Sequence, residues 1–129
     1  MIPNAIEEFL RYEAPSPIQA RLVMNDVEMY GRTVPAGSKM ALLTGSAGRD
    51  DRQYIEPDRL DVRRKISGHV SFGHGIHHCL GAALARLEAR VALEELLDRF
   101  PAWEIDETSS EMVHTSTVRG WHRLPAQAV

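Results

Sequence analysis

The sequence predicts an α+β chain in which helices and a small antiparallel sheet support one glycine-bearing loop. Residues 82–99 contain neither Gly nor Pro, and strong helix formers dominate them. Between residues 19 and 43, short apolar runs are separated by turn residues, which indicates hairpins. The predicted helix also has an apolar stripe with spacings of four, three and four, formed by Leu80, Leu84, Leu87 and Val91.

The bulk properties describe one domain over residues 1–129 with no obvious charged partner. The chain has 15 basic and 18 acidic residues, so we expect neither nucleic acid nor an anionic membrane surface as a partner. No apolar run is long enough to cross a bilayer, and the first residues resemble a helix start rather than a signal peptide. Cys79 is the only cysteine, which excludes an internal disulfide and suits a reducing cytoplasm.

The first predicted element is a helix over residues 3–13. Pro3 suits the first helical turn, and Ile6, Phe9 and Leu10 supply an apolar side. Glu8 and Arg11 lie three residues apart, so they share a face and can pair. Taken alone, such a pair is most often a solvated surface ion pair of little energetic consequence.

A sheet of short hairpins follows the helix. The extended runs are residues 19–24, 27–30 and 40–43, and a Pro-Ala-Gly turn at 35–37 precedes the last of them. Residues 44–68 are rich in loop-forming residues, with a short helix expected over 48–54. After the long helix, residues 103–106 alternate apolar and charged side chains, which predicts a strand.

Residues 69–81 form the loop on which the functional prediction depends. Cys79 lies just ahead of the helix at 82–99, where unpaired backbone N–H groups favour negative charge and therefore the metal-binding thiolate. Gly75 supplies a turn that other residues resist, and Gly81 lets the main chain approach a flat ligand closely. Phe72 offers an apolar ring that would shield the sulfur from water, and His77 places a donor near the edge of such a ligand.

The spacing Phe72-x-x-Gly75-x-x-x-Cys79-x-Gly81 resembles the haem-binding loop of cytochromes P450, and the surrounding residues resemble the soluble bacterial branch. The resemblance implies haem b as cofactor, with Cys79 as its axial metal ligand and the catalytic cysteine. It implies propionate contacts from Arg21, His69 and His77. The full set of cofactor-binding residues that it implies is Cys79, Phe72, Gly73, Gly75, His77, Gly81, Arg21, His69 and Ala85.

The resemblance extends along nearly the whole chain. Glu8-x-x-Arg11 is similar to the Glu-x-x-Arg of the family's K helix, and Pro57-Asp58-Arg59-Leu60 to its Pro-x-Arg-Phe, which implies a buried Glu8–Arg11–Arg59 network. Residues 82–99 correspond to the proximal L helix, and residues 113–125 to the C-terminal β hairpin. The chain therefore resembles the C-terminal third of the P450 fold. It lacks an Ala-Gly-x-(Asp/Glu)-Thr segment, which the family's oxygen-activating helix carries.

The functional expectation from the resemblance is a haem-thiolate monooxygenase, which inserts one atom of dioxygen into a small apolar organic substrate. Electrons would come from NAD(P)H through a ferredoxin-type donor. The donor would dock near Arg63, Arg64 and Lys65, although these residues also fit an ordinary solvated charge cluster. The resemblance also implies that the helices covering the family's substrate pocket are absent from this sequence, and that the proximal helix has lost packing partners. This leaves open a marginally stable chain, a partly molten chain or a homodimer through the exposed face.

Two other functions stay open at this point. One is a non-catalytic haem-binding or interaction module, because the oxygen-activating helix is not in this sequence. The other is a zinc site, although its spacing fits no closed zinc pattern. The candidate zinc ligands are His74, His77, His78 and Cys79.

Overall fold

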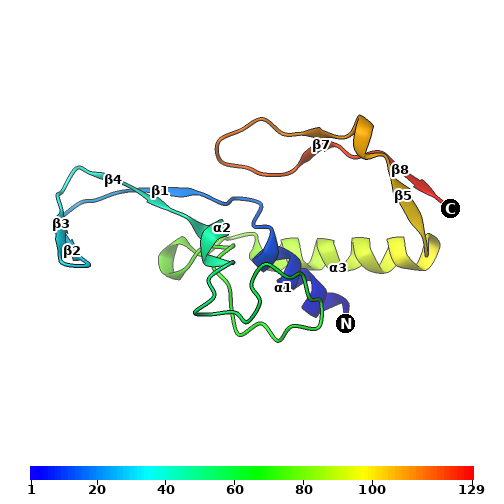
Figure 1. Ribbon diagram of the computed structural model, residues 1–129, viewed down its shortest axis with the longest axis horizontal. Coiled ribbons are helices and arrows are strands. Elements are labelled where there is room, and N and C mark those ends of the chain that lie inside the picture. The colour runs from blue at the N-terminus through cyan, green and yellow to red at the C-terminus, as the bar shows by residue number, and fades with distance from the viewer.

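The computed structural model describes residues 1–129 and has an elongated shape (Figure 1). The longest element is α3 (Ala82–Arg99), with the bounds that the sequence predicted. α1 (Ile2–Tyr12) packs against α3 and lies near the middle of the molecule. Pro3 occupies the first turn of α1, where its missing N–H has no intrahelical partner to lose. The two helices thus form the frame that positions the loop between them.

A hairpin arm extends from one end of this frame (Figure 1). β1 (Gln19–Leu22) pairs antiparallel with β4 (Lys39–Leu42), and β2 (Val27–Met29) pairs with β3 (Arg32–Val34) at the tip. Tyr30 and Gly31 both have positive φ, 50° and 72°, as a two-residue turn that matches strand twist requires. The predicted hairpins are confirmed, but they form two separate two-stranded sheets rather than one.

The prediction of a short helix over residues 48–54 is wrong. The structure has α2 at Thr44–Ala47 instead, and residues 51–53 form a turn. The Asp50 carboxylate accepts hydrogen bonds from the backbone and the guanidinium of Arg52, each at 2.9 Å, and such local bonds compete with a helix. Farther along, the 3₁₀ turn η1 (Gly75–His77) lies in the cysteine loop.

The C-terminal strands lie along α3 (Figure 1). β5 (Trp103–Ile105) pairs with β8 (Ala126–Ala128), and β6 (Glu111–Met112) pairs with β7 (Trp121–Arg123), with the 3₁₀ turn η2 (Glu107–Ser109) between β5 and β6. The strand at 103–106 is confirmed within one residue. The predicted hairpin has its first strand at 111–112, because residues 113–120 form the connection to β7.

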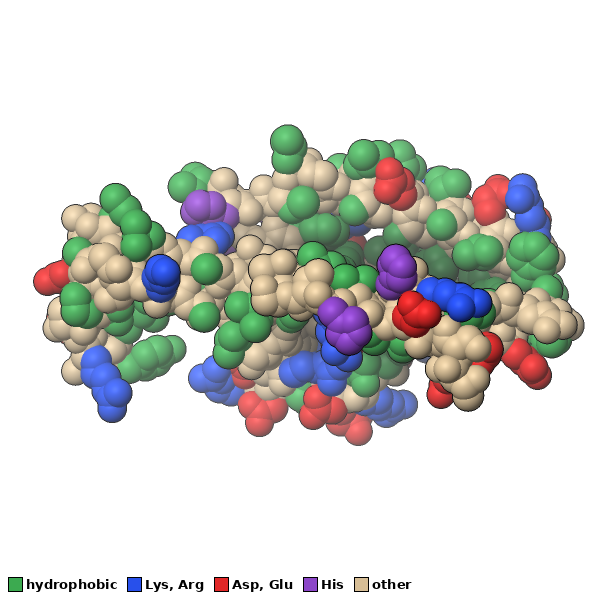
Figure 2. All heavy atoms as spheres, turned by 90° about the horizontal axis from the view of Figure 1, so that it is seen from above, with side chains coloured by type: hydrophobic (Ala, Val, Ile, Leu, Met, Phe, Trp, Pro, Cys, Tyr) green, Lys and Arg blue, Asp and Glu red, His purple; other side chains and the backbone are tan.

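The buried core is small and contains charged residues. Nine residues are buried, and the largest wholly buried side chains are Arg11 and Glu8 rather than apolar groups. The predicted apolar stripe of α3 is exposed, with Leu84, Leu87 and Val91 between 45% and 58% accessible. Figure 2 shows hydrophobic side chains spread along one face of the molecule. None of the helices combines the length and apolar character needed to cross a bilayer.

Candidate functional site

One face of α1 carries the polar residues that organise the site. Asn4, Glu7, Glu8 and Arg11 follow at spacings of three, one and three, so they share the inward side of the helix. Asn4 Nδ2 donates to the carbonyls of Val62 and Arg64 at 2.6 and 3.0 Å. The adjacent glutamates bind different partners, and α1 thereby connects the loop that carries Cys79 to the segment at 57–64.

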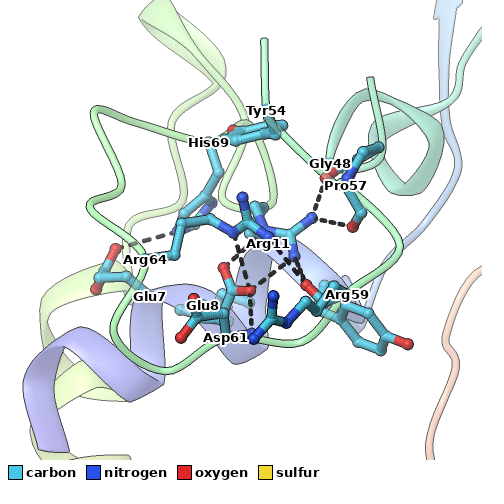
Figure 3. A network of polar contacts seen from close by, with 12 residues as sticks. Glu7, Glu8, Arg11, Gly48, Tyr54, Pro57, Arg59, Asp61, Arg64 and His69 are labelled. Carbon is cyan, nitrogen blue, oxygen red and sulfur yellow. Dashed lines mark hydrogen bonds and ion pairs between the residues drawn. The ribbon is translucent and has the colours of Figure 1, made fainter. Parts of the chain in front are cut away.

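Arg11 is wholly buried, and all five of its N–H donors have partners (Figure 3). Nε and Nη2 donate to the carboxylate oxygens of Glu8 at 2.7 and 2.8 Å. Nη1 donates to the carbonyls of Gly48 and Pro57 at 2.6 and 2.8 Å, and Nη2 also donates to the carbonyl of Arg59 at 3.2 Å. The guanidinium therefore joins α1 to the end of α2 and to residues 57–59.

Glu8 is equally well satisfied. Besides the two bonds from Arg11, its Oε1 accepts from the Asp61 N–H at 2.8 Å and from Arg64 Nε at 3.2 Å. Burial alone would raise the pKa of Glu8, but the hydrogen bonds from Arg11, Asp61 and Arg64 outweigh it and lower the pKa to about 2. A buried pair with every donor and acceptor satisfied specifies one arrangement of the surrounding loops.

The predicted Glu8–Arg11 pair is present, but the expectation for the Arg59 side chain is wrong. The Arg59 guanidinium pairs with Glu56 at 3.3 Å, and both side chains are 65% exposed. Only the Arg59 carbonyl enters the network. Arg64, whose side chain is 12% exposed, supplies the second arginine instead. The bend at Glu56, where φ is 48°, and the Asp61 N–H bond to Glu8 place Arg64 rather than Arg59 beside the carboxylate.

Glu7 is the centre of a second network, next to the cysteine loop. Arg86 Nε and Nη2 donate to its two oxygens at 2.6 and 3.0 Å, and His69 Nε2 lies 3.1 Å from Oε2. The Arg86 bonds lower the pKa of Glu7 against the opposing effect of burial. This bidentate pair links α1 to α3 across 79 residues of sequence.

His69 belongs to the Glu7 network. Its side chain is 2% exposed, and the Ser71 N–H donates to Nδ1 at 3.2 Å, which places the ring proton on Nε2 facing Glu7. Burial lowers the pKa of His69, while the hydrogen bond to Glu7 acts in the opposite direction. Because protein groups engage both ring nitrogens, this geometry speaks against the propionate contact predicted for His69.

The cysteine loop is held in a tight turn by backbone hydrogen bonds. The Cys79 N–H donates to the Phe72 carbonyl at 2.7 Å, and the Gly73 N–H donates to the Val70 carbonyl at 2.8 Å. Gly73 and Gly75 have φ of 75° and 60°, which other residues rarely adopt. A Cβ on Gly73 would also lie 2.7 Å from the His77 carbonyl oxygen. The turn therefore requires glycine at residue 73 for two independent reasons.

Cys79 emerges from this turn with an exposed thiol, beside a hollow of about 310 Å³. Phe72, Gly73, His77 and Arg21 contribute to its lining. The Arg21 guanidinium forms no ion pair, and Nη1 donates only to the neighbouring Ala20 carbonyl at 2.8 Å. The structure thus brings four predicted cofactor-binding residues to the cysteine.

The remaining predicted residues do not line this hollow. Gly81 caps the N-terminus of α3, and a Cβ there would lie 3.9 Å from Cys79 Sγ, so the main chain stays close to the sulfur. Ala85 is exposed on the first turn of α3, and Gly75 is exposed at η1. Haem fits this donor set, because a free thiol, an adjacent aromatic ring and an unpaired arginine meet at one opening. Zinc has no matching site, since the structure has no group of three His, Cys, Asp or Glu residues that could hold a metal ion.

Sequence reasoning missed four residues that support the site. These are Glu7, Gly48, Arg64 and Arg86. The role of Glu7 could have been predicted from the sequence, because the spacing of Asn4, Glu7, Glu8 and Arg11 indicates one polar face of a helix. No pattern in the sequence identified Gly48 as a residue that supports the site. In the structure its backbone packs closely against α1, because a Cβ on Gly48 would lie 2.2 Å from the Arg11 carbonyl oxygen.

An exposed cysteine at the start of a long helix, on a glycine-dependent turn beside a hollow, is the arrangement of the haem-thiolate class of proteins. Residues 1–128 match the family model described as Cytochrome P450, and the chain belongs to this family. The predicted family, fold class and haem b cofactor are confirmed by this match and by the relatives below.

The relatives are bacterial P450 proteins. The chain is 50% identical over 125 residues to the putative cytochrome P450 123 of Mycobacterium tuberculosis (strain H37Rv), covering 96% of this chain and 31% of the relative. It is 41% identical over 128 residues to 6-deoxyerythronolide B hydroxylase of Saccharopolyspora erythraea, covering 98% and 32%. The crystal structure of P450BioI in complex with an acyl carrier protein ligated to hexadec-9Z-enoic acid superimposes with a TM-score of 0.93 at 38% identity, covering 99% and 33%. The chain spans about a third of the length of these relatives.

Proposed function

We propose that this chain is the haem-binding portion of a P450 monooxygenase, with Cys79 Sγ as the axial ligand of haem iron. The observation that carries the proposal is the exposed Cys79 thiol, which a glycine-dependent turn holds beside the hollow shared with Phe72, His77 and Arg21. Bound haem supplies the activation of dioxygen for insertion of one oxygen atom into an organic substrate. The alternative of a non-catalytic haem module is not favoured, because the relatives include named hydroxylases.

The residues around Cys79 have separate roles in this proposal. The Cys79 thiolate would hold the haem iron and would supply the electron density that a thiolate ligand contributes to oxygen activation. Phe72, whose carbonyl accepts the Cys79 N–H and which lines the same hollow, would shield the sulfur from water when haem is bound. Arg21 and His77 line the hollow and serve the haem propionates, for which the unpaired Arg21 guanidinium is well suited.

The substrate and partners follow from the family. A small apolar organic molecule is the proposed substrate class, in keeping with the vitamin D(3) 25-hydroxylase of Pseudonocardia autotrophica, which is 45% identical over 128 residues. A ferredoxin-type electron donor would dock at the exposed Arg63 and Lys65. Arg64 does not contribute, because Glu8 engages it. We also propose a cytoplasmic location, and a homodimer through the exposed apolar side of α3.

A haem titration tests this function directly. The purified chain is titrated with haem, reduced and exposed to carbon monoxide, and its Soret band is recorded. We expect the band of a thiolate-ligated complex in the wild type and its loss in Cys79→Ser. His114→Gln is the control, because His114 is a histidine outside the cysteine loop. A band that persists in Cys79→Ser, or no specific binding by the wild type, would contradict the proposal.

A further inference from the structure

The Phe72 ring, which lines the hollow beside Cys79, has two charged or polar neighbours that do not line the hollow themselves. The Arg86 guanidinium carbon lies 4.6 Å from the centroid of the ring. The ring of His69 lies 6.1 Å from it, at an interplanar angle of 41°. Both neighbours bind the same carboxylate, that of Glu7 on α1. Glu7 therefore holds two side chains that contact one aromatic ring.

The same loop has a second connection to α1. Ser71 Oγ donates to the Leu10 carbonyl at 2.6 Å, and the Ser71 N–H donates to His69 Nδ1. The Leu10 carbonyl lies in the last turn of α1, where carbonyl groups lack an intrahelical partner. Residues 69–72 are thus bonded to α1 on both sides of Val70. The Phe72 carbonyl then accepts the Cys79 N–H at 2.7 Å, so this chain of contacts ends at the cysteine.

We propose that Glu7, acting with Arg86 and His69, is a positioning residue that sets the place of Phe72 and, through it, of Cys79. This inference deepens the proposed function and rests on it where haem is concerned. Glu7 touches neither the cysteine nor the hollow beside it, so its effect passes through the ring and the backbone of the loop. The Glu7 network is separate from the buried Glu8–Arg11 pair, which bonds to residues 48–64 instead.

Amide hydrogen exchange of the full chain, without haem, tests the positioning role. Uniformly ¹⁵N-labelled wild type, Glu7→Gln and Arg86→Lys are compared at the amides of Cys79 and Gly73, with the amide of Val23 as reference. Val23 is buried and donates to the Ser38 carbonyl at 2.9 Å in the hairpin arm. Arg86→Lys keeps the positive charge but loses the bidentate geometry.

We expect exchange at Cys79 and Gly73 to accelerate roughly tenfold in Glu7→Gln and by a smaller factor in Arg86→Lys, with no change at Val23. Glu95→Gln is the matched control, because Glu95 pairs with Arg99 at 2.7 Å on the exposed part of α3. It should leave all three amides unchanged. An equal acceleration at Val23 would assign Glu7 a general structural role, and unchanged exchange at Cys79 would show no role at all. Either result overturns the inference.

The haem-loaded chain gives a second readout. In Glu7→Gln, the fraction of the reduced carbon monoxide complex with a thiolate-type Soret band should fall at least twofold, as roughly expected when a supporting contact of a metal ligand is removed. An unchanged fraction overturns the inference. If the wild type itself shows no Cys79-dependent band, the proposed function fails, while the exchange comparison still decides whether Glu7 positions the loop.

Discussion

Replacing Glu8 by Gln should be among the most damaging single substitutions in α1. The change keeps the size of the side chain but removes the charge that balances the wholly buried Arg11. In the folded chain the pKa of Glu8 is about 2 instead of 4.5, and this difference corresponds to about 3 kcal/mol at 1.36 kcal/mol per pH unit. Removing one partner of a buried ion pair typically costs about 3–5 kcal/mol. The two estimates agree, so we expect the free energy of unfolding to fall by about 3–4 kcal/mol.

The same reasoning sets a pH dependence. Because folding lowers the pKa of Glu8, its stabilising effect is complete above pH 4.5 and is lost as the pH falls toward 2. Wild-type stability should therefore decline over this range, and Glu8→Gln should lack that part of the decline. Urea unfolding followed by circular dichroism at pH 7 and at steps down to pH 3 measures both quantities.

Glu56→Gln is the matched control for Glu8→Gln. Glu56 also pairs with an arginine three residues away, but both side chains are 65% exposed, so the change should cost less than about 1 kcal/mol. Equal losses in the two variants would refute the reasoning, because burial would then have no effect on the ion pair. The reasoning would also be refuted if Glu8→Gln kept the full decline in stability between pH 4.5 and 3.

Three further tests apply the same unfolding assay to other parts of the structure. Gly73→Ala should lower the free energy of unfolding more than Gly31→Ala. Both residues have φ above 70°, so each change introduces about 1–2 kcal/mol of strain. Only Gly73 also has a backbone oxygen 2.7 Å from the added Cβ. Similar losses would show that this contact relaxes freely. Arg64→Met should lower the free energy of unfolding by about 1.5–3 kcal/mol, and Arg59→Met by less than about 1 kcal/mol. The reverse order would show that Arg59, rather than Arg64, is the second arginine of the Glu8 network. Gly48→Ala should cost about 3 kcal/mol, because its Cβ would meet a backbone oxygen of α1 at 2.2 Å, and a neutral result would contradict that close approach.

The exposed apolar side of α3 illustrates how sequence and structure inform each other. The spacing of Leu84, Leu87 and Val91 predicted a stripe suited to packing, and the structure leaves all three substantially accessible. Relatives that share the fold are about three times as long as this chain. An apolar stripe indicates that a helix face is suited to burial, but the sequence of the helix does not identify what covers that face.

The sequence alone determined the local features of this protein. The bounds of α3 follow from a run without Gly or Pro, and the Glu8–Arg11 pair from a spacing of three residues on one helix. The cysteine loop was recognisable because Phe72, Gly75, Cys79 and Gly81 must lie at fixed intervals within ten residues. Each of these features depends on neighbours along the chain, so sequence spacing carries nearly all the information.

Only the tertiary structure decided which distant groups meet. Arg59 and Arg64 are equally charged and five residues apart, and the path of the backbone from Glu56 to Asp61 selects Arg64 as the partner of Glu8. Likewise, the geometry speaks against a propionate contact of His69 because Glu7, 62 residues away, engages it. Hydrogen bonds require atoms to approach within about 3 Å, and small shifts of a loop decide which donor does so. Sequence spacing does not contain that information across long separations.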